Sequence, residues 1–142
     1  FYPVFSARFN THLRLEAQSF SERAGQYAEA VSFIKTNPLF GVGPGVFTYA
    51  LHAKYPTLSY WQYQPIHNIY VLGIVEMGLL GIVGIGILLI TLLRIVIKNN
   101  LLYIPVLVCL LVVGLFDHWL LSMFSGMVFF WVIVGLGNKK VQ

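Results

Sequence analysis

The chain has 142 residues, of which 58% are hydrophobic and only 10% are charged, and its formal net charge is +4. Soluble domains are about 25% charged, so this composition and a mean hydropathy of +0.77 indicate a membrane protein. We expect the few basic residues to set topology or to meet lipid or phosphate, and we expect no nucleic-acid partner.

The polar first part, residues 1–67, is predicted to be an outer-facing helical loop region ahead of a membrane part over 68–142. Phe20 to Thr36 is predicted to form one helix, because Ser19 and Glu22 have the spacing of a capping box. Asn37-Pro38 ends it, since the residue before proline avoids the α region. Apolar residues at helical period predict its buried face. They are Phe20, Ala24, Tyr27, Val31 and Ile34.

A glycine-rich turn at Gly41–Gly45 follows, and after it the segment 46–66 is rich in Tyr and Trp. The turn either presents backbone N–H groups to an anion or is a plain turn. It lacks the lysine and serine of a phosphate-binding loop and does not match a dinucleotide fingerprint. Because Tyr and Trp favour membrane interfaces, we expect the segment 46–66 to form an ordered loop or short helices there.

The apolar stretches of the membrane part predict three transmembrane helices, at about 79–97, 101–116 and 119–136. A bilayer core of about 30 Å needs about 20 residues of helix. The first apolar run, Ile69 to Ile97, is longer than this, so its start is expected to form a short interfacial helix joined to the span at Gly78. The predicted fold class is an all-α membrane protein with about three transmembrane helices plus the outer-facing helical loop region.

Basic residues predict the orientation of these spans. Arg94 and Lys98 lie at the end of the first predicted span, and Lys139 and Lys140 follow the third. With three spans, both pairs fall on the same side of the membrane. By the positive-inside rule that side is the cytoplasm, so residues 1–67 and the Asp117-His118 pair face outward. The chain begins at Phe1 without a signal-peptide pattern, so we expect it to be the C-terminal part of a larger membrane protein.

Polar residues at the edges of the apolar runs are the candidate chemistry. His67 precedes the first run, and histidine is the side chain best suited to take a proton near neutral pH. Asn68 either orients the ring or a substrate hydroxyl, or caps the following helix. Asp117-His118 separates the second and third runs, and is either a functional ionisable pair or a polar turn between antiparallel helices.

The basic residues of the first part are candidates for binding an anion. Arg23 flanks the predicted apolar face, where its planar fork suits phosphate, or it is a snorkelling surface arginine. Arg14 and Lys54 are individually weaker candidates, mostly solvated by default.

Three other features carry no predicted chemistry. Glu76 lies about 180° from His67 on a continuous helix, so we expect it to contact another helix or the interface. The single Cys109 lies in an apolar run, where a thiol is usually inert. The chain has no metal-ligand pattern such as H-E-x-x-H, and we predict no metal.

The motifs, taken in order, resemble the O-antigen ligase and O-antigen polymerase family. They are Arg23 in a helix, Asn37 to Phe47 (NPLFGVGPGVF), His67 to Tyr70 (HNIY) and Glu76 to Gly81 (EMGLLG). The outer Asp117 fits further on. The resemblance implies an inner-membrane glycosyltransferase with a large periplasmic loop. Such an enzyme moves a glycan from undecaprenyl diphosphate to a sugar hydroxyl of lipid A-core or of another repeat unit.

The resemblance also implies roles for single residues. Arg23 is expected to pair with the diphosphate, and His67 to act as general base or to orient the acceptor. Substrate binding is expected of Asn68, Arg14, Lys54, Asp117 and His118. The aromatic segment 46–66 is expected to offer a stacking surface to sugars, and no cofactor is expected. The chain alone is expected to be inactive, because other helices complete the cavity.

A different class of function stays open from the residues. In this alternative the chain is a non-enzymatic membrane module, such as part of a transporter or an assembly subunit. It would use Asp117-His118 as a proton or ion site inside the helix bundle.

Overall fold

The computed structural model describes residues 2–99 and 103–137, with side chains from Ala17 onward except at Val96 and Asn99. The elements in this part of the chain are all helices, so the predicted all-α class is confirmed. The predicted turn residue Asn100 and the basic pair Lys139 and Lys140 lie outside the described residues.

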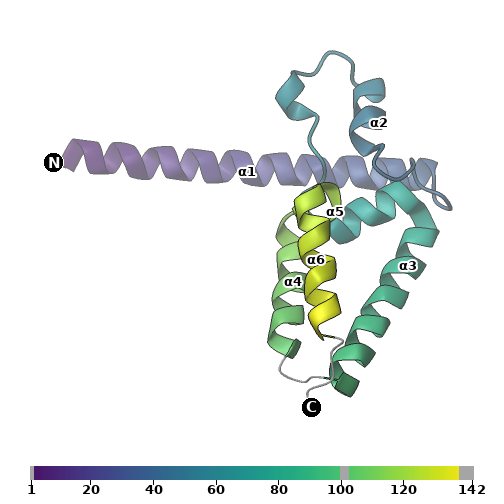
Figure 1. Ribbon diagram of the computed structural model, residues 1–142. Coiled ribbons are helices and arrows are strands. Elements are labelled where there is room, and N and C mark those ends of the chain that lie inside the picture. The colour runs from purple at the N-terminus through teal and green to yellow at the C-terminus, as the bar shows by residue number, and fades with distance from the viewer. Residues whose placement is uncertain (1, 100–102, 138–142) are drawn as a thin grey trace.

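A long first helix, α1 (Tyr2–Thr36), runs across the molecule, and the other helices lie on its two sides (Figure 1). It ends as predicted, before Asn37-Pro38. The predicted start at Ser19 is wrong, because the helix begins upstream and passes through this position. The preceding Ala, Leu, Arg, Glu and Gln residues favour helix, and neither proline nor glycine interrupts them after Pro3.

The predicted buried face of α1 is also wrong. Phe20 is 72% exposed and Val31 is 50% exposed, whereas Ala30 and Phe33 are buried. The Phe33 ring meets the edge of Phe47, with 5.7 Å between ring centroids. Apolar residues occur on more than one side of this helix, so contact with the next helix selects the face that is buried.

The helix α2 (Phe47–Lys54) and the 3-10 helix η1 (Tyr60–Gln62) lie on one side of α1, opposite the apolar helices (Figure 1). One core joins α1, α2 and the start of the third helix. Its buried members are Ala30, Phe33, Phe47, Leu51, Ile66, Leu72 and Val75. The segment 46–66 therefore contains short helices, one of the two forms expected, and α2 packs on α1.

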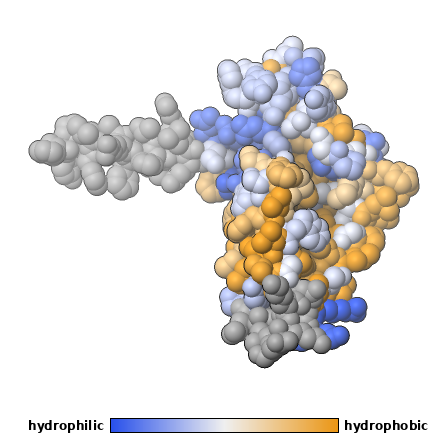
Figure 2. Space-filling model, in the orientation of Figure 1, coloured by the Kyte–Doolittle hydropathy of each residue, from blue (hydrophilic) through white to orange (hydrophobic). Residues whose placement is uncertain are grey.

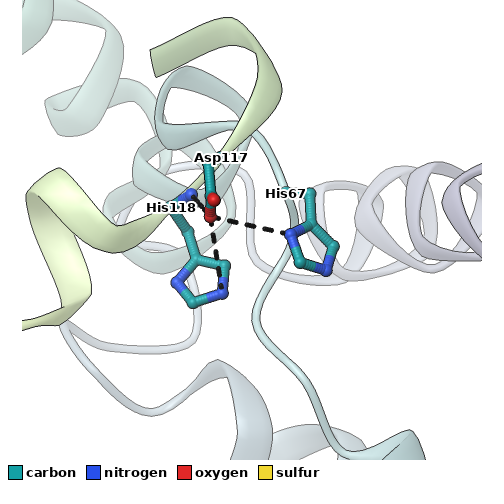
Figure 3. Close-up of side chains that lie close together, drawn as sticks. All are labelled: His67, Asp117 and His118. Atoms are coloured by element: carbon teal, nitrogen blue, oxygen red, sulfur yellow. Dashed lines mark hydrogen bonds and ion pairs between the residues drawn. The ribbon is translucent and has the colours of Figure 1, made fainter. Parts of the chain in front are cut away.

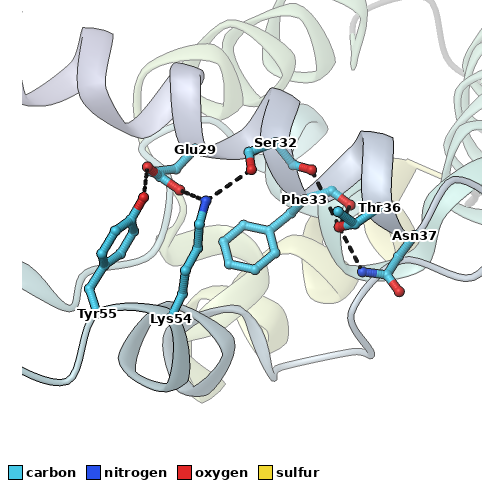
Figure 4. Close-up of polar contacts among 7 residues, drawn as sticks. All are labelled: Glu29, Ser32, Phe33, Thr36, Asn37, Lys54 and Tyr55. Atoms are coloured by element: carbon cyan, nitrogen blue, oxygen red, sulfur yellow. Dashed lines mark hydrogen bonds and ion pairs between the residues drawn. The ribbon is translucent and has the colours of Figure 1, made fainter.

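A polar contact fastens α2 to α1 (Figure 4). Lys54 Nζ donates to Glu29 Oε2 at 2.7 Å and to Ser32 Oγ at 2.9 Å, and Tyr55 Oη donates to Glu29 Oε1 at 2.8 Å. Burial raises the pKa of Glu29, but these hydrogen bonds outweigh it and hold that pKa below its ordinary value. The hydrogen bond to Glu29 raises the pKa of Lys54. The positive charge of Lys54 is thus paired with Glu29 within the fold.

The helix α3 (Ile69–Asn99) bends at Gly78, where φ is 59° and ψ is −140°, at the joint that the sequence predicts (Figure 1). The chain after α1 fills this break. Leu79 N–H donates to the Pro38 carbonyl at 2.9 Å, and Val42 N–H donates to the Val75 carbonyl at 3.0 Å. A Cβ on Gly78 would lie 2.6 Å from Leu39 backbone, so only glycine fits.

The remaining helices are α4 (Ile104–Phe116), α5 (Trp119–Ser122) and α6 (Phe124–Gly137). The third predicted span is interrupted at Met123, whose ψ of 134° is extended. Ser122 Oγ donates to the His118 carbonyl at 3.1 Å. This side-chain hydrogen bond competes with the backbone hydrogen bonds of the helix, and α5 ends at Ser122. Gly126 lets α6 approach the Trp119 carbonyl more closely than any side chain would allow.

The helices α3, α4 and α6, called the lower helices below, present apolar side chains on the outside of the molecule. Residues Ile69–Ile95 of α3 are long and apolar enough to cross a membrane, whereas α4 and α6 are shorter apolar helices. Figure 2 shows the apolar surface gathered over these helices and the polar surface over α1 and α2. An uncovered apolar surface of this extent belongs in lipid, so the chain is a membrane protein.

Candidate functional site

The site begins where the polar part meets α3. Asn68 is buried, and its Oδ1 accepts hydrogen bonds from Tyr70 N–H at 3.0 Å and Val71 N–H at 3.1 Å. Its Nδ2 donates to the Leu115 carbonyl of α4 at 3.2 Å. Asn68 therefore caps α3, as the simpler interpretation expects, and ties α3 to the end of α4. This holds His67, one residue earlier, beside the turn after α4.

That turn brings Asp117 and His118 to His67 (Figure 3). Asp117 Oδ1 lies 3.7 Å from His67 Nδ1 and 4.0 Å from His118 Nε2, and the two imidazole centroids are 5.1 Å apart. The other ring nitrogen of His67 points away from the carboxylate (Figure 3). The distances are those of an ion pair, longer than a hydrogen bond. Three of the predicted site residues thus form one cluster.

The His118 ring is the most enclosed of the three. Its side chain is 13% exposed, against 32% for His67 and 47% for Asp117. Its Nδ1 lies 2.6 Å from Ser122 Oγ. Burial lowers the pKa of His118, and the positive charge of a protonated His67 lowers it further, while Asp117 opposes both. His118 is therefore held neutral near pH 7.

These three side chains are also a group that offers metal ligands. His67, Asp117 and His118 each present one ligand atom, and these atoms lie within 4.8 Å of one another. A tetrahedral zinc ion with bonds of about 2.0–2.1 Å needs ligand atoms about 3.3 Å apart. The cluster would therefore have to contract to hold zinc.

The predicted cations lie in different surroundings. Arg23 is exposed on α1. One turn after it, Gln26 Oε1 accepts a hydrogen bond from His67 N–H at 3.3 Å. Residues three apart on a helix share a face, so Arg23 lies on the side of α1 that meets the His67 segment. Lys54 is engaged with Glu29 as described above, and the side chain of Arg14 lies outside the described residues.

Glu76 and the glycine-rich turn belong together, which the sequence does not predict. Glu76 Oε2 accepts from Gly45 N–H at 2.9 Å and its Oε1 from Phe47 N–H at 3.4 Å. The turn does present one N–H group, that of Gly45, to an anion, and that anion is a carboxylate of the same chain. The sequence feature that could have indicated this contact is an acidic residue within an apolar run, together with a glycine-rich turn that precedes it.

Comparison with known proteins gives a family. The family model described as O-antigen ligase matches residues 1–86. The matched segment contains α1, the glycine-rich turn, His67, Asn68 and Glu76, whereas Asp117 and His118 lie beyond it. The search of curated proteins and the search of solved structures give no match.

Proposed function

The chain belongs to the O-antigen ligase family, and from this premise we propose that it carries part of the active site of a membrane glycosyltransferase. The donor would be a glycan on undecaprenyl diphosphate, and the acceptor a sugar hydroxyl of lipid A-core or of another repeat unit. The acceptor oxygen forms the new bond to the anomeric carbon, the bond from that carbon to the diphosphate oxygen breaks, and undecaprenyl diphosphate leaves.

The approach of Asp117 to His67 is the observation that supports this proposal most directly. In the reaction His67 takes the hydroxyl proton on the ring nitrogen that points away from Asp117. Asp117, 3.7 Å from Nδ1, orients the ring and stabilises the imidazolium that forms. Because a neutral His118 carries no charge to pair with Asp117, the carboxylate charge acts on the imidazolium of His67 alone of the two rings.

Arg23 is the proposed partner of the diphosphate. An exposed guanidinium on the face of α1 that meets His67 suits two phosphate oxygens and stabilises the charge that develops on the leaving group. Arg14, earlier on the same helix, is a second proposed contact. Lys54 and Asn68 act indirectly, because the first fastens α2 to α1 and the second caps α3.

We further propose that the protein lies in the bacterial inner membrane with residues 1–67 in the periplasm. Arg94 and Lys98 near the far end of α3 favour the cytoplasmic side for that end. The site at the start of α3 is then on the outer side, where the lipid-linked glycan is used.

The test compares two histidines of the same part of the chain. The variant His67→Gln in the full-length protein should lose at least about 100-fold in glycan transfer, the lower range for removing an acid–base group. His52→Gln is the matched control, since His52 is exposed and packs on Tyr63 with 4.9 Å between ring centroids. Transfer is measured with purified protein and lipid-linked glycan. Equal activity of the two variants would sink the assignment of His67.

A further inference from the structure

A hollow of about 520 Å³ lies between α1, α2 and the segment that contains η1. Its apolar lining includes the aromatic rings of Phe47, Tyr55 and Trp61. The volume is within the range of about 300–1,000 Å³ that is usual for small-molecule sites. None of the proposed catalytic side chains lines it, so it is a separate feature of the polar part of the protein.

The polar lining of the hollow is dominated by four glutamine amides. An amide offers both donors and acceptors without a charge, which matches sugar hydroxyls. In each of the four, one amide atom is held by a neighbour, which restricts the rotation of the amide before any ligand binds. The held contacts are Gln18 Nε2 to Glu22 Oε1 (2.9 Å), Gln26 Oε1 from His67 N–H (3.3 Å), Gln62 Oε1 from Ser59 N–H (2.9 Å) and Gln64 Nε2 to the Trp61 carbonyl (2.8 Å).

The charges of the lining disfavour an anionic ligand. Glu22 and Glu29 are the ionisable carboxylates among the described lining residues, and no lysine or arginine is among them. The Glu29 charge is balanced by Lys54. A diphosphate would therefore meet no cation among these described lining residues, whereas a neutral group with many hydroxyls would meet complementary amides.

The hollow reaches the proposed catalytic histidine through one residue. Gln26 lines the hollow and accepts the hydrogen bond from His67 N–H. A ligand on the Gln26 amide thus lies next to the segment that carries His67.

We propose that this hollow binds neutral sugar units of the glycan that the protein transfers or extends. The apolar face of a pyranose ring stacks on Trp61, whose indole is large and rigid, and the hydroxyls bond to the glutamine amides. The proposal rests on the glycosyltransferase function above and adds to it a binding site for the uncharged part of the substrate, apart from the diphosphate.

The test uses two neighbouring aromatic residues of η1. Trp61 lines the hollow and is 72% exposed, whereas Tyr60 is 91% exposed and is not part of the lining. Both are changed to alanine in full-length protein that also carries His67→Gln, so that binding is measured without turnover. The probe is the oligosaccharide released by mild acid from the surface glycan of the host, titrated by calorimetry in lipid nanodiscs.

Trp61→Ala should weaken binding at least about tenfold, a change of about 1.4 kcal/mol. Trp61→Phe should recover most of the affinity, and Tyr60→Ala should bind as the parent does. Inorganic pyrophosphate should not compete. Equal affinities of the two alanine variants, or displacement of the oligosaccharide by equimolar pyrophosphate, would overturn the proposal. A failure of the transferase assignment is separate, because it appears as retained transfer in His67→Gln alone.

Discussion

Among single residues, Asp117 has the central place, because one of its oxygens faces two imidazole rings. Asp117 Oδ1 also accepts from His118 N–H at 2.6 Å, which fixes the carboxylate on its own turn. The two histidines differ in surroundings, since His118 is enclosed and bonded to Ser122 while His67 is a third exposed. The cluster therefore combines an enclosed ring, which stays neutral, with a more open ring, which is the one proposed to meet the substrate.

The enclosed His118 predicts a pH dependence of stability. Burial lowers its pKa in the folded state, so the unfolded state binds more protons once the pH falls below its ordinary value of 6.5. The contribution of His118 to the free energy of unfolding should be fully present above about pH 6.5. Below that pH it should be lost, up to about 1.4 kcal/mol for each unit by which the pKa is lowered. Thermal unfolding at pH 7.5, 6.0 and 5.0 measures this loss.

The variant His118→Gln should lose less stability than the parent over the same pH interval. His52→Gln, at an exposed histidine, should follow the parent. The prediction is wrong if His118→Gln and the parent lose stability equally between pH 7.5 and 5.0.

Among the helices, the break in α3 is the feature that organises the polar half of the molecule. The turn after α1 enters the break, where its N–H groups meet the Val75 and Glu76 carbonyls. The Glu76 carboxylate then holds the far side of the turn and the start of α2. α1, α2 and α3 are thereby fixed to one another at a single place, close to the start of the membrane part.

Two glycines make this approach possible and give a prediction for stability. A Cβ on Gly41 would lie 2.4 Å from the Glu76 carbonyl carbon, and one on Gly78 would lie 2.6 Å from Leu39 backbone. Both glycines have positive φ, which costs other residues about 1–2 kcal/mol even without a clash. Gly41→Ala and Gly78→Ala should each lose at least about 2 kcal/mol of unfolding free energy.

The matched control is Gly86→Ala, because Gly86 lies in the same helix and a Cβ there meets nothing within 4 Å. This variant should be neutral or more stable by up to about 1 kcal/mol. Thermal unfolding in detergent compares the three. If Gly41→Ala and Gly86→Ala unfold alike, the turn is not clamped in the way described.

The chain as a whole divides into a packed polar half and an apolar lower half. The core cluster lies among α1, α2 and the first section of α3, whereas the lower helices expose apolar side chains such as Leu93 and Trp131 (Figure 2). α4 has 13 residues and α6 has 14, each about 20 Å long against a bilayer core of about 30 Å. The section of α3 after Gly78 is about 30 Å long and matches that core.

The proposed orientation predicts which positions a membrane-impermeant thiol reagent reaches. In a Cys109→Ala background, Tyr60→Cys should be labelled in intact cells with a permeable outer membrane. The reason is that Tyr60 is exposed in the polar half, which is proposed to face the periplasm. Lys98→Cys, at the far end of α3, should be labelled only after the inner membrane is opened. The reverse pattern would invert the topology and remove His67 from the periplasm.

The membrane class, the all-helical fold and the joint at Gly78 could be predicted from the amino-acid sequence, and so could the family, through the order of its motifs. The first three follow from local properties, because apolar run length, glycine and proline act on neighbouring backbone. The packing of the helices was needed to show that Ala30 and Phe33 form the buried face of α1, that Glu76 binds the glycine-rich turn, and that Asp117 meets His67. Periodicity counts apolar residues on a face but carries no information on the partner, and contacts between distant residues depend on how the helices pack.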